Sequence, residues 1–258
     1  MTAKIVVAIS SLAVAFTAAG CMNFYEIPVE IPIQAKIDVS GFQRVLVAGF
    51  VTGGTKNIDP NTETARLLRS QLRTKSDMRV IDAEVISLVD EVDKQRAVTG
   101  QGPAAPAPAT PDEPKIKTDK DLPNYEAIFS NADYWKKIGA QYQSPLIVTG
   151  TVMFTEVSKS GVVTSPQTFV DAQGNSHYRE ERAFRDLKGY ALVPKFVFID
   201  GRTGKQLYEE TFHEEALYPS GQNTPALSSY FELMDKLLPA FLNTLSSQKI
   251  KGSRVLLK

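Results

Sequence analysis

The chain has 258 residues, of which 43% are hydrophobic and 22% are charged, a balance typical of a globular protein with a sizeable core. Its 29 basic residues equal its 29 acidic residues, so the formal net charge is zero. Nucleic-acid-binding proteins usually carry a basic excess or a clustered basic stripe, so this composition argues against a nucleic-acid partner. The single cysteine excludes an internal disulfide, and the fold must therefore depend on burial and hydrogen bonds.

Residues 1–20 have the features of a bacterial export signal. Lys4 supplies the positive charge, an apolar run follows from Ile5 to Phe16, and three small residues then lead to Cys21. The apolar run is shorter than the roughly 20 residues that a membrane-spanning helix needs. We therefore expect this segment to be removed and to take no part in the fold.

Small residues directly before the sole cysteine resemble a lipobox, the site where bacterial lipoproteins are acylated on cysteine and cleaved before it. The resemblance implies that Cys21 is the lipid-attachment residue and the first residue of the mature protein. The alternative is an ordinary signal peptide with a chance cysteine near the cut. Met22 stands where an aspartate signals inner-membrane retention in many lipoproteins, so we expect an outer-membrane location on the periplasmic face.

The segment 27–39, "IPVEIPIQAKIDV", alternates apolar and polar residues with the period of a strand that buries one face. Pro28 and Pro32 remove backbone donors from the same edge, which predicts an extended N-terminal edge strand. The strand either extends the protein's own sheet or reaches a neighbouring subunit and extends that sheet. The candidate partner-binding residues are Ile27, Val29, Ile31, Ile33 and Ile37.

Between residues 43 and 154, short apolar runs alternate with amphipathic segments, which predicts alternating strands and helices. Strands are expected at "RVLVAGF" (Arg44–Phe50), "MRVID" (Met78–Asp82) and "PLIVTGTVMF" (Pro145–Phe154). Helices are expected after Asn61, which can cap the first of them, from Ala83 to about Gln95, and over "YWKKIGAQY" (Tyr134–Tyr142).

The later part of the chain predicts a hairpin and a closing helix. The segments "YALVPKFVFID" and "KQLYEETFHEE" are expected to pair across the turn Gly201–Gly204. The helix carries one broad apolar face, made of Leu227, Tyr230, Phe231, Met234, Leu237, Leu238, Phe241 and Leu245. Pro239 must either kink this helix or lie on its solvent side.

Four blocks in this order, "RVLVAGF", "LLRSQLRTKSDMRVIDAEVI", "YWKKIGAQYQSPLIVTGTV" and "FVFIDGRTGKQLYEETF", resemble a known periplasmic domain. It is shared by curli-secretion-channel (CsgG-like) lipoproteins, the TolB N-terminal domain and Lpo-type activators of cell-wall synthases. The resemblance covers Arg44 to about Leu245 and implies an α/β fold, a mixed β-sheet flanked by helices of the anticodon-binding-like type. We thus expect a signal peptide (1–20), an anchor with its strand (21–40) and one α/β domain (41–258).

Two insertions interrupt the blocks. Residues 97–123 hold six prolines and no apolar periodicity, which predicts a disordered, solvated spacer. Residues 158–188 predict a hairpin around Gln173–Asn175. In curli channels, insertions of this kind supply membrane-spanning strands, which need an apolar face over about 9–11 residues. In this hairpin neither set of alternate residues, odd-numbered or even-numbered, is continuously apolar. We therefore expect it to stay in water and to form no pore.

The sequence offers no convincing catalytic or metal-binding set. "GFVTGGTK" (Gly49–Lys56) lacks the lysine register of a phosphate-binding loop and predicts a flexible loop. "HEEAL" (His213–Leu217) has leucine where a zinc-protease helix needs its second histidine. His177 lies in a charged turn. We therefore expect no cofactor, no metal and no enzymatic activity.

These features together predict a non-catalytic lipoprotein that binds other envelope proteins. The main hypothesis is an assembly or scaffold component of a secretion or export apparatus, with homo-oligomers formed through the N-terminal strand. The alternative is an adaptor or activator of cell-wall synthesising enzymes. In Lpo-type proteins a long spacer usually separates anchor and domain, whereas here the spacer is internal, which favours the main hypothesis.

Overall fold

The computed structural model describes residues 24–100, 102, 114–246 and 248–257. Backbone contacts divide the described residues into two compact units, one within residues 36–246 and one made of residues 24–35 and 248–257. The predicted export signal and Cys21 lie outside the described residues. The larger unit holds the sheet and the helices, and the smaller one holds a pair of strands.

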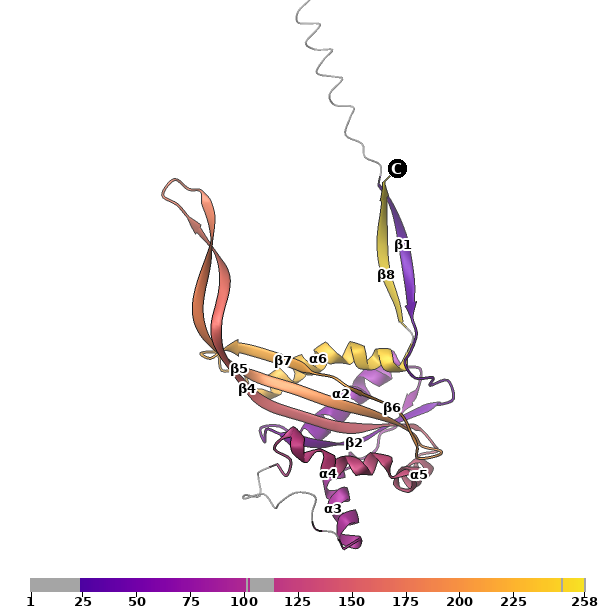
Figure 1. Ribbon diagram of the computed structural model, residues 1–258. Helices are drawn as coiled ribbons and strands as arrows, with labels where there is room; N and C mark the ends of the chain where they lie inside the picture. Colours follow the sequence, from indigo (N-terminus) through magenta and orange to yellow (C-terminus); the bar gives the residue numbers. More distant parts are fainter. Residues whose placement is uncertain (1–23, 101, 103–113, 247, 258) are drawn as a thin grey trace, which may run out of the picture. The chain divides into compact units, whose positions relative to one another are not determined.

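The larger unit is built on one six-stranded sheet (Figure 1). Its strands are β2 (Arg44–Gly54), β3 (Arg79–Val80), β4 (Leu146–Val170), β5 (Ser176–Asp200), β6 (Gln206–Thr211) and β7 (Glu214–Pro219). The order is β3-β2-β4-β5-β6, and β7 pairs with a second stretch of β5. Because β2 runs parallel to β3 and β4 while the other pairs are antiparallel, the predicted mixed sheet is confirmed.

Helices cover both faces of this sheet, as the α/β prediction requires. One face packs against α2 (Pro60–Lys75) and α6 (Ala226–Leu245). The other packs against α3 (Leu88–Val98), α4 (Pro123–Glu126), α5 (Ala132–Gln141) and the 3-10 turn η2 (Ala127–Ser130), which follows η1 (Asp119–Asp121). Strand β2 is buried along nearly its whole length, which explains its continuous apolar sequence.

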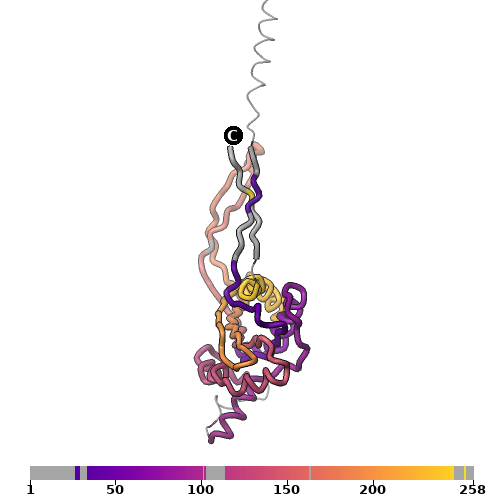
Figure 2. Tube along the Cα trace, turned by 90° about the vertical axis from the view of Figure 1, so that its right-hand side faces the viewer, coloured from indigo at the N-terminus to yellow at the C-terminus, as the bar shows by residue number. Residues whose placement is uncertain are grey.

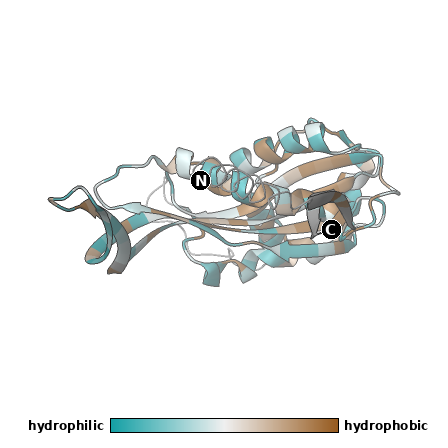
Figure 3. Cartoon of the chain, turned by 90° about the horizontal axis from the view of Figure 1, so that it is seen from above, coloured by the Kyte–Doolittle hydropathy of each residue, from teal (hydrophilic) through white to brown (hydrophobic). Residues whose placement is uncertain are grey.

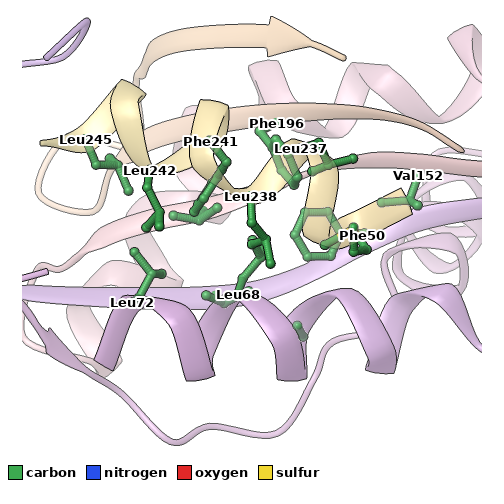
Figure 4. Close-up of a cluster of buried hydrophobic side chains, with 14 of the residues drawn as sticks. Phe50, Leu68, Leu72, Val152, Phe196, Leu237, Leu238, Phe241, Leu242 and Leu245 are labelled. Atoms are coloured by element: carbon green, nitrogen blue, oxygen red, sulfur yellow. The ribbon is translucent and has the colours of Figure 1, made fainter. Parts of the chain in front are cut away.

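The largest hydrophobic cluster lies between α2, α6 and the sheet (Figure 4). Leu68 and Leu72 of α2 point toward the apolar face of α6, and all of these leucines are buried. Phe196 of β5 contacts the ring of Phe241 at 4.8 Å between centroids. Pro239 is exposed, so of its two predicted positions it takes the solvent side of α6.

Strand β1 (Phe24–Ile33) does not join this sheet, which corrects the predicted position of the N-terminal edge strand. It pairs antiparallel with β8 (Gln248–Leu257) over its whole length, and we call this pair the terminal ribbon. Pro28 and Pro32 have nitrogens on one edge only, so the other edge remains free to pair. The strand ends at Ile33 rather than at residue 39.

Residues 36–39 are not strand because the end of α6 draws the chain into the core. The backbone N–H groups of Lys36 and Ile37 both donate to the carbonyl of Thr244, at 3.1 Å. Ile37 is buried there at 8% exposure. This local capture explains why the alternating pattern continues in the sequence but not in the structure.

Two predictions around the first strand were wrong. The segment from Gly49 to Gly54 is part of β2 and not a flexible loop. A bulge after Val47 and a positive φ at Gly49 bring its backbone against Ile86, where a Cβ would meet the carbonyl oxygen at 2.2 Å. Asp59, not Asn61, caps α2; the Asn61 side chain instead bridges Phe50 N–H and the Ile86 carbonyl.

The Pro-rich insertion is ordered at both of its ends, which corrects its predicted extent. Residues 97–98 complete α3, and residues 114–123 pack onto the domain. Ile116 is fully buried, and its carbonyl accepts the N–H of Gly54 at 3.0 Å. Residues 103–113, where four of the prolines fall, lie outside the described residues.

Candidate interaction surface

Strands β4 and β5 run on past the helices as a two-stranded hairpin, which we call the arm (residues 157–189; Figure 1). The two strands stay side by side to the turn in both views (Figures 1 and 2). The turn lies at residues 171–175, where the sequence predicts it, and Gly174 has a φ of 86°. The Asp171 carboxylate accepts the backbone N–H groups of Gln173 and Asn175, which fixes the turn.

One face of the arm exposes apolar and aromatic side chains. Val162 lies directly opposite Phe184 in the strand register, and their exposures are 67% and 69%. Tyr178, opposite Thr168 on the same face, is 82% exposed. Figure 3 shows hydrophilic and hydrophobic colours mixed along the arm, whereas hydrophobic colours dominate the strands between the helices. The arm therefore presents large rings that the fold itself does not use.

Charged residues lie beside these rings along the arm. In the described part of the chain, no ion pair or side-chain hydrogen bond involves Arg179, Glu180, Glu181, Arg182, Arg185 or Asp186. All of them are exposed. Aromatic residues and arginine are enriched in protein interfaces, where such groups find complementary partners. The arm has this composition.

The opposite face near the turn is internally braced. The ring of His177 stacks on Phe169 at 5.5 Å, and one ring nitrogen contacts the Asp171 carboxylate at 2.7 Å. The hydrogen bond with His177, and then those from Asn175 and Gln173, lower the pKa of Asp171. These contacts hold the shape of the tip and account for the histidine in the turn as a structural residue.

A groove of about 700 Å³ lies at the base of the arm. It is lined by Glu156, Val157, Ser158, Lys188, Gly189, Tyr190, Tyr218, Ser220, Gly221, Gln222, Asn223 and Thr224. Tyr190 stacks on Phe154 at 4.9 Å, which connects one wall of the groove to the core. Lys159 pairs with Glu215 of β7 at 2.7 Å and ties the arm to that strand. The groove thus lies where the arm meets the main sheet.

Two tyrosines with hydroxyl groups, Tyr190 and Tyr218, line the groove. Burial, and then the nearby Glu156 carboxylate, raises the pKa of Tyr190. Burial, and then a hydrogen bond to Glu232, raises the pKa of Tyr218. Both hydroxyls therefore stay protonated at neutral pH; that of Tyr218 donates its proton to the Glu232 carboxylate, and that of Tyr190 can donate to a bound partner.

The other candidate motifs do not assemble a reactive site among the described residues. Strand β7 begins at Glu214, so "HEEAL" is not on a helix. In the residues that the structure describes, no group of three or more His, Cys, Asp or Glu side chains could hold a metal ion. Within the same residues, no helix is both long and apolar enough to cross a membrane.

The structure separates the predicted partner-binding residues. Ile27, Val29, Ile31 and Ile33 lie in β1, where Ile27 and Val29 are 41% and 36% exposed. Ile37 belongs to the core of the larger unit and cannot contact a partner, which corrects its inclusion. The aromatic residues of the arm were not predicted as a binding surface. Charged residues occupy the same alternate positions of the strands, so no continuous apolar face is visible in the sequence. Strand β8 was not predicted either, although "KIKGSRVLL" has enough β-branched and apolar residues to suggest a strand.

A scan of protein-family models and a search of curated proteins found no match to this chain. Solved structures that it resembles include lipoprotein GNA1162 from Neisseria meningitidis, with 11% identity and a TM-score of 0.34 over 78% of this chain and 98% of that one. The LpoB C-terminal domain from Escherichia coli has 8% identity and a TM-score of 0.30 over 67% and 83%. That from Salmonella enterica has 9% identity and a TM-score of 0.29 over 78% and 90%. Neither a curli channel nor a TolB domain is among these three, and likeness at this level shows neither partner nor activity.

Proposed function

We propose that the protein is an envelope lipoprotein, anchored through Cys21 on the periplasmic face of the outer membrane, that binds and regulates a cell-wall synthesising enzyme. The observation that carries the binding role is the arm, with its exposed rings and its charges that have no partner in the described residues. The class of partner rests on the sequence blocks that resemble Lpo-type activators.

In Lpo-type proteins a long spacer usually separates anchor and domain, whereas here the spacer is internal. The arm offers another way to reach a partner. From Val157 to Val170 the strand takes 13 steps, which at about 3.4 Å each gives a length of roughly 44 Å. Reach toward a partner can therefore come from the paired strands of the arm rather than from a disordered tether. At its base the arm is joined to β7 by the Lys159–Glu215 ion pair, next to the groove.

The scaffold hypothesis is the second candidate, but its original basis is weaker. It relied on β1 extending the sheet of a neighbour, whereas β1 is paired with β8 along its length. Pro28 and Pro32 lack the donors needed to pair a further strand at its other edge. What still favours self-association is the apolar face with Ile27 and Val29 exposed. Light scattering of the unacylated chain tests it, and a strict monomer at high concentration would exclude it.

The binding role is tested by co-purification from envelope extracts, with the double variant Tyr178→Asp/Phe184→Asp as the comparison. We expect the wild-type protein to capture a cell-wall synthase and the variant to bind it roughly 30-fold more weakly, the effect of losing an aromatic hot spot. The purified synthase should also be stimulated by the wild type and not by the variant.

Leu207→Asp serves as the matched control, because Leu207 is an exposed apolar residue (44%) on β6, away from the arm. It should behave as the wild type in both assays. The proposal is wrong if no synthase is captured, or if the arm variant and the control lose binding to the same degree.

A further inference from the structure

The terminal ribbon brings together two apolar segments from opposite ends of the chain. In its register Phe24 faces Leu257, Tyr25 faces Leu256 and Glu26 faces Val255. We call these six positions the ribbon tip; all but Glu26 are apolar or aromatic. Neither segment stands out in the sequence by itself, and it is the strand pairing that brings the two to the same end of the ribbon.

The tip differs from the rest of the ribbon in having apolar residues on both faces. Residues alternate between the two faces of a strand pair and opposite residues share a face, so the register assigns Phe24 and Leu257 to one face and Tyr25 and Leu256 to the other. Further along, apolar residues of β1 keep to one parity and prolines or glutamates take the other. A protein surface that docks on one side covers one face only, whereas a lipid layer surrounds both.

The position of the tip along the chain points to the same environment. Cys21 precedes Phe24 by three residues, so their Cα atoms are at most about 11 Å apart in any conformation. This step rests on the proposed lipid attachment at Cys21. Acyl chains on that residue would hold the tip against the bilayer surface.

The dimensions of the tip suit the interfacial layer of a membrane. Two strand steps from Phe24 to Glu26 give about 7 Å, and interfacial segments bury their apolar face by about 5–10 Å. Aromatic residues such as Phe24 and Tyr25 are favoured at that depth. Arg254, the first residue past the tip on β8, occupies the position where charged head groups begin.

We propose that the ribbon tip inserts into the lipid head-group layer and forms a second membrane contact, made by the protein itself. The acyl chains and the tip then hold the membrane end of the ribbon at two points. The ribbon tip contacts a bilayer surface and not a partner protein.

The test uses the mature chain from residue 21 with Cys21→Ser, which carries no acyl group. We expect it to float with vesicles of phosphatidylethanolamine and phosphatidylglycerol. Leu256→Asp/Leu257→Asp in the same background should lower the partition coefficient at least roughly tenfold, because two buried leucines are lost. Val162→Asp/Phe184→Asp on the arm is the control and should bind vesicles as the parent does.

A second measurement covers the case in which the charged variant unpairs the ribbon. Tyr25→Trp in the Cys21→Ser chain should show a blue shift of tryptophan emission when vesicles are added, while the buried Trp135 gives a constant background. Absence of both flotation and the shift overturns the proposal, as does equal flotation of the Leu256→Asp/Leu257→Asp chain. Palmitate labelling of the wild-type chain tests the lipid anchor separately, so an unlabelled protein whose unacylated form still floats would refute the anchor and keep the tip.

Discussion

The arm and the terminal ribbon are both long antiparallel strand pairs, but their sequences are built for different surroundings. The arm continues two strands of the main sheet and mixes aromatic residues with charges on the same face. The ribbon shares no strand with that sheet, and its tip has apolar residues at both parities. A face that mixes rings with charges suits a hydrated protein partner, whereas a tip with apolar residues on both faces suits a lipid layer. Exposed apolar residues therefore mean different things in the two places.

The largest expected effect contrasts a ring in the core with a ring on the arm. Phe196→Ala should lower the free energy of unfolding by about 3–5 kcal/mol, because Phe196 is fully buried against Phe50, Phe212 and Phe241. Phe184→Ala should change it by no more than about 0.5 kcal/mol. Urea unfolding of both variants measures this. A large loss for Phe184→Ala would mean that the arm is part of the core and not a free surface.

The next effect compares two glycines of the same hairpin. A Cβ on Gly189 would lie 1.8 Å from the carbonyl oxygen of Ala216, so Gly189→Ala must push β7 away from the arm base, at a cost of about 1–3 kcal/mol. A Cβ on Gly161 meets no atom within 4 Å, and Gly161→Ala should be nearly neutral. Thermal unfolding of the two variants decides it, and equal destabilisation would contradict the close packing of β7 described here.

A smaller effect is expected at the ion pair that ties the arm to β7. Lys159→Ala removes the partner of Glu215, and because Lys159 is more than half exposed the loss should stay below about 1 kcal/mol. Lys188→Ala, on the same arm but outside any ion pair in the described residues, is the control. The difference between the two should shrink at high salt, and a salt-independent difference would argue against an electrostatic tie.

The smallest effect is a pH dependence at the groove. A hydrogen bond from Lys236, and then one from Tyr218, lower the pKa of Glu232 below its ordinary 4.5. A lowered carboxyl pKa stabilises the fold above the unfolded value, and this contribution is lost as the pH falls through the folded pKa. Glu232→Gln should therefore flatten the stability profile slightly below about pH 5, by less than about 0.5 kcal/mol for so exposed a pair. Urea titrations between pH 3 and pH 7 measure it, and an unchanged profile would contradict the shift.

Much of the larger unit was predictable because its signals are local. Continuous apolar runs gave β2 and the start of β4, the apolar face gave α6, and the turn at Gly201–Gly204 gave the pairing of β5 with β6. The predictions failed where contacts between segments that are distant in the sequence decide the local structure. Asn61 has the chemistry of a cap but is held between Phe50 and Ile86, a contact that no local pattern contains.

The surfaces were less predictable because their meaning depends on pairing. The alternation of β1 was visible, yet its partner β8 lies more than 200 residues away in the sequence. Ile37 has the same parity as Ile27, but the carbonyl at Thr244 draws it into the core. On the arm, parity arguments indicated only that the hairpin stays in water, while the register shows that Val162 and Phe184 form one exposed pair.

The central claim is that the arm contacts another protein in the envelope, and photocrosslinking in living cells tests it most directly. A photoreactive phenylalanine analogue in place of Phe184 should give one discrete heavier band that contains a cell-wall synthase, and the same analogue at Leu207 should give none. No protein adduct from position 184, or the same adducts from both positions, would contradict the account.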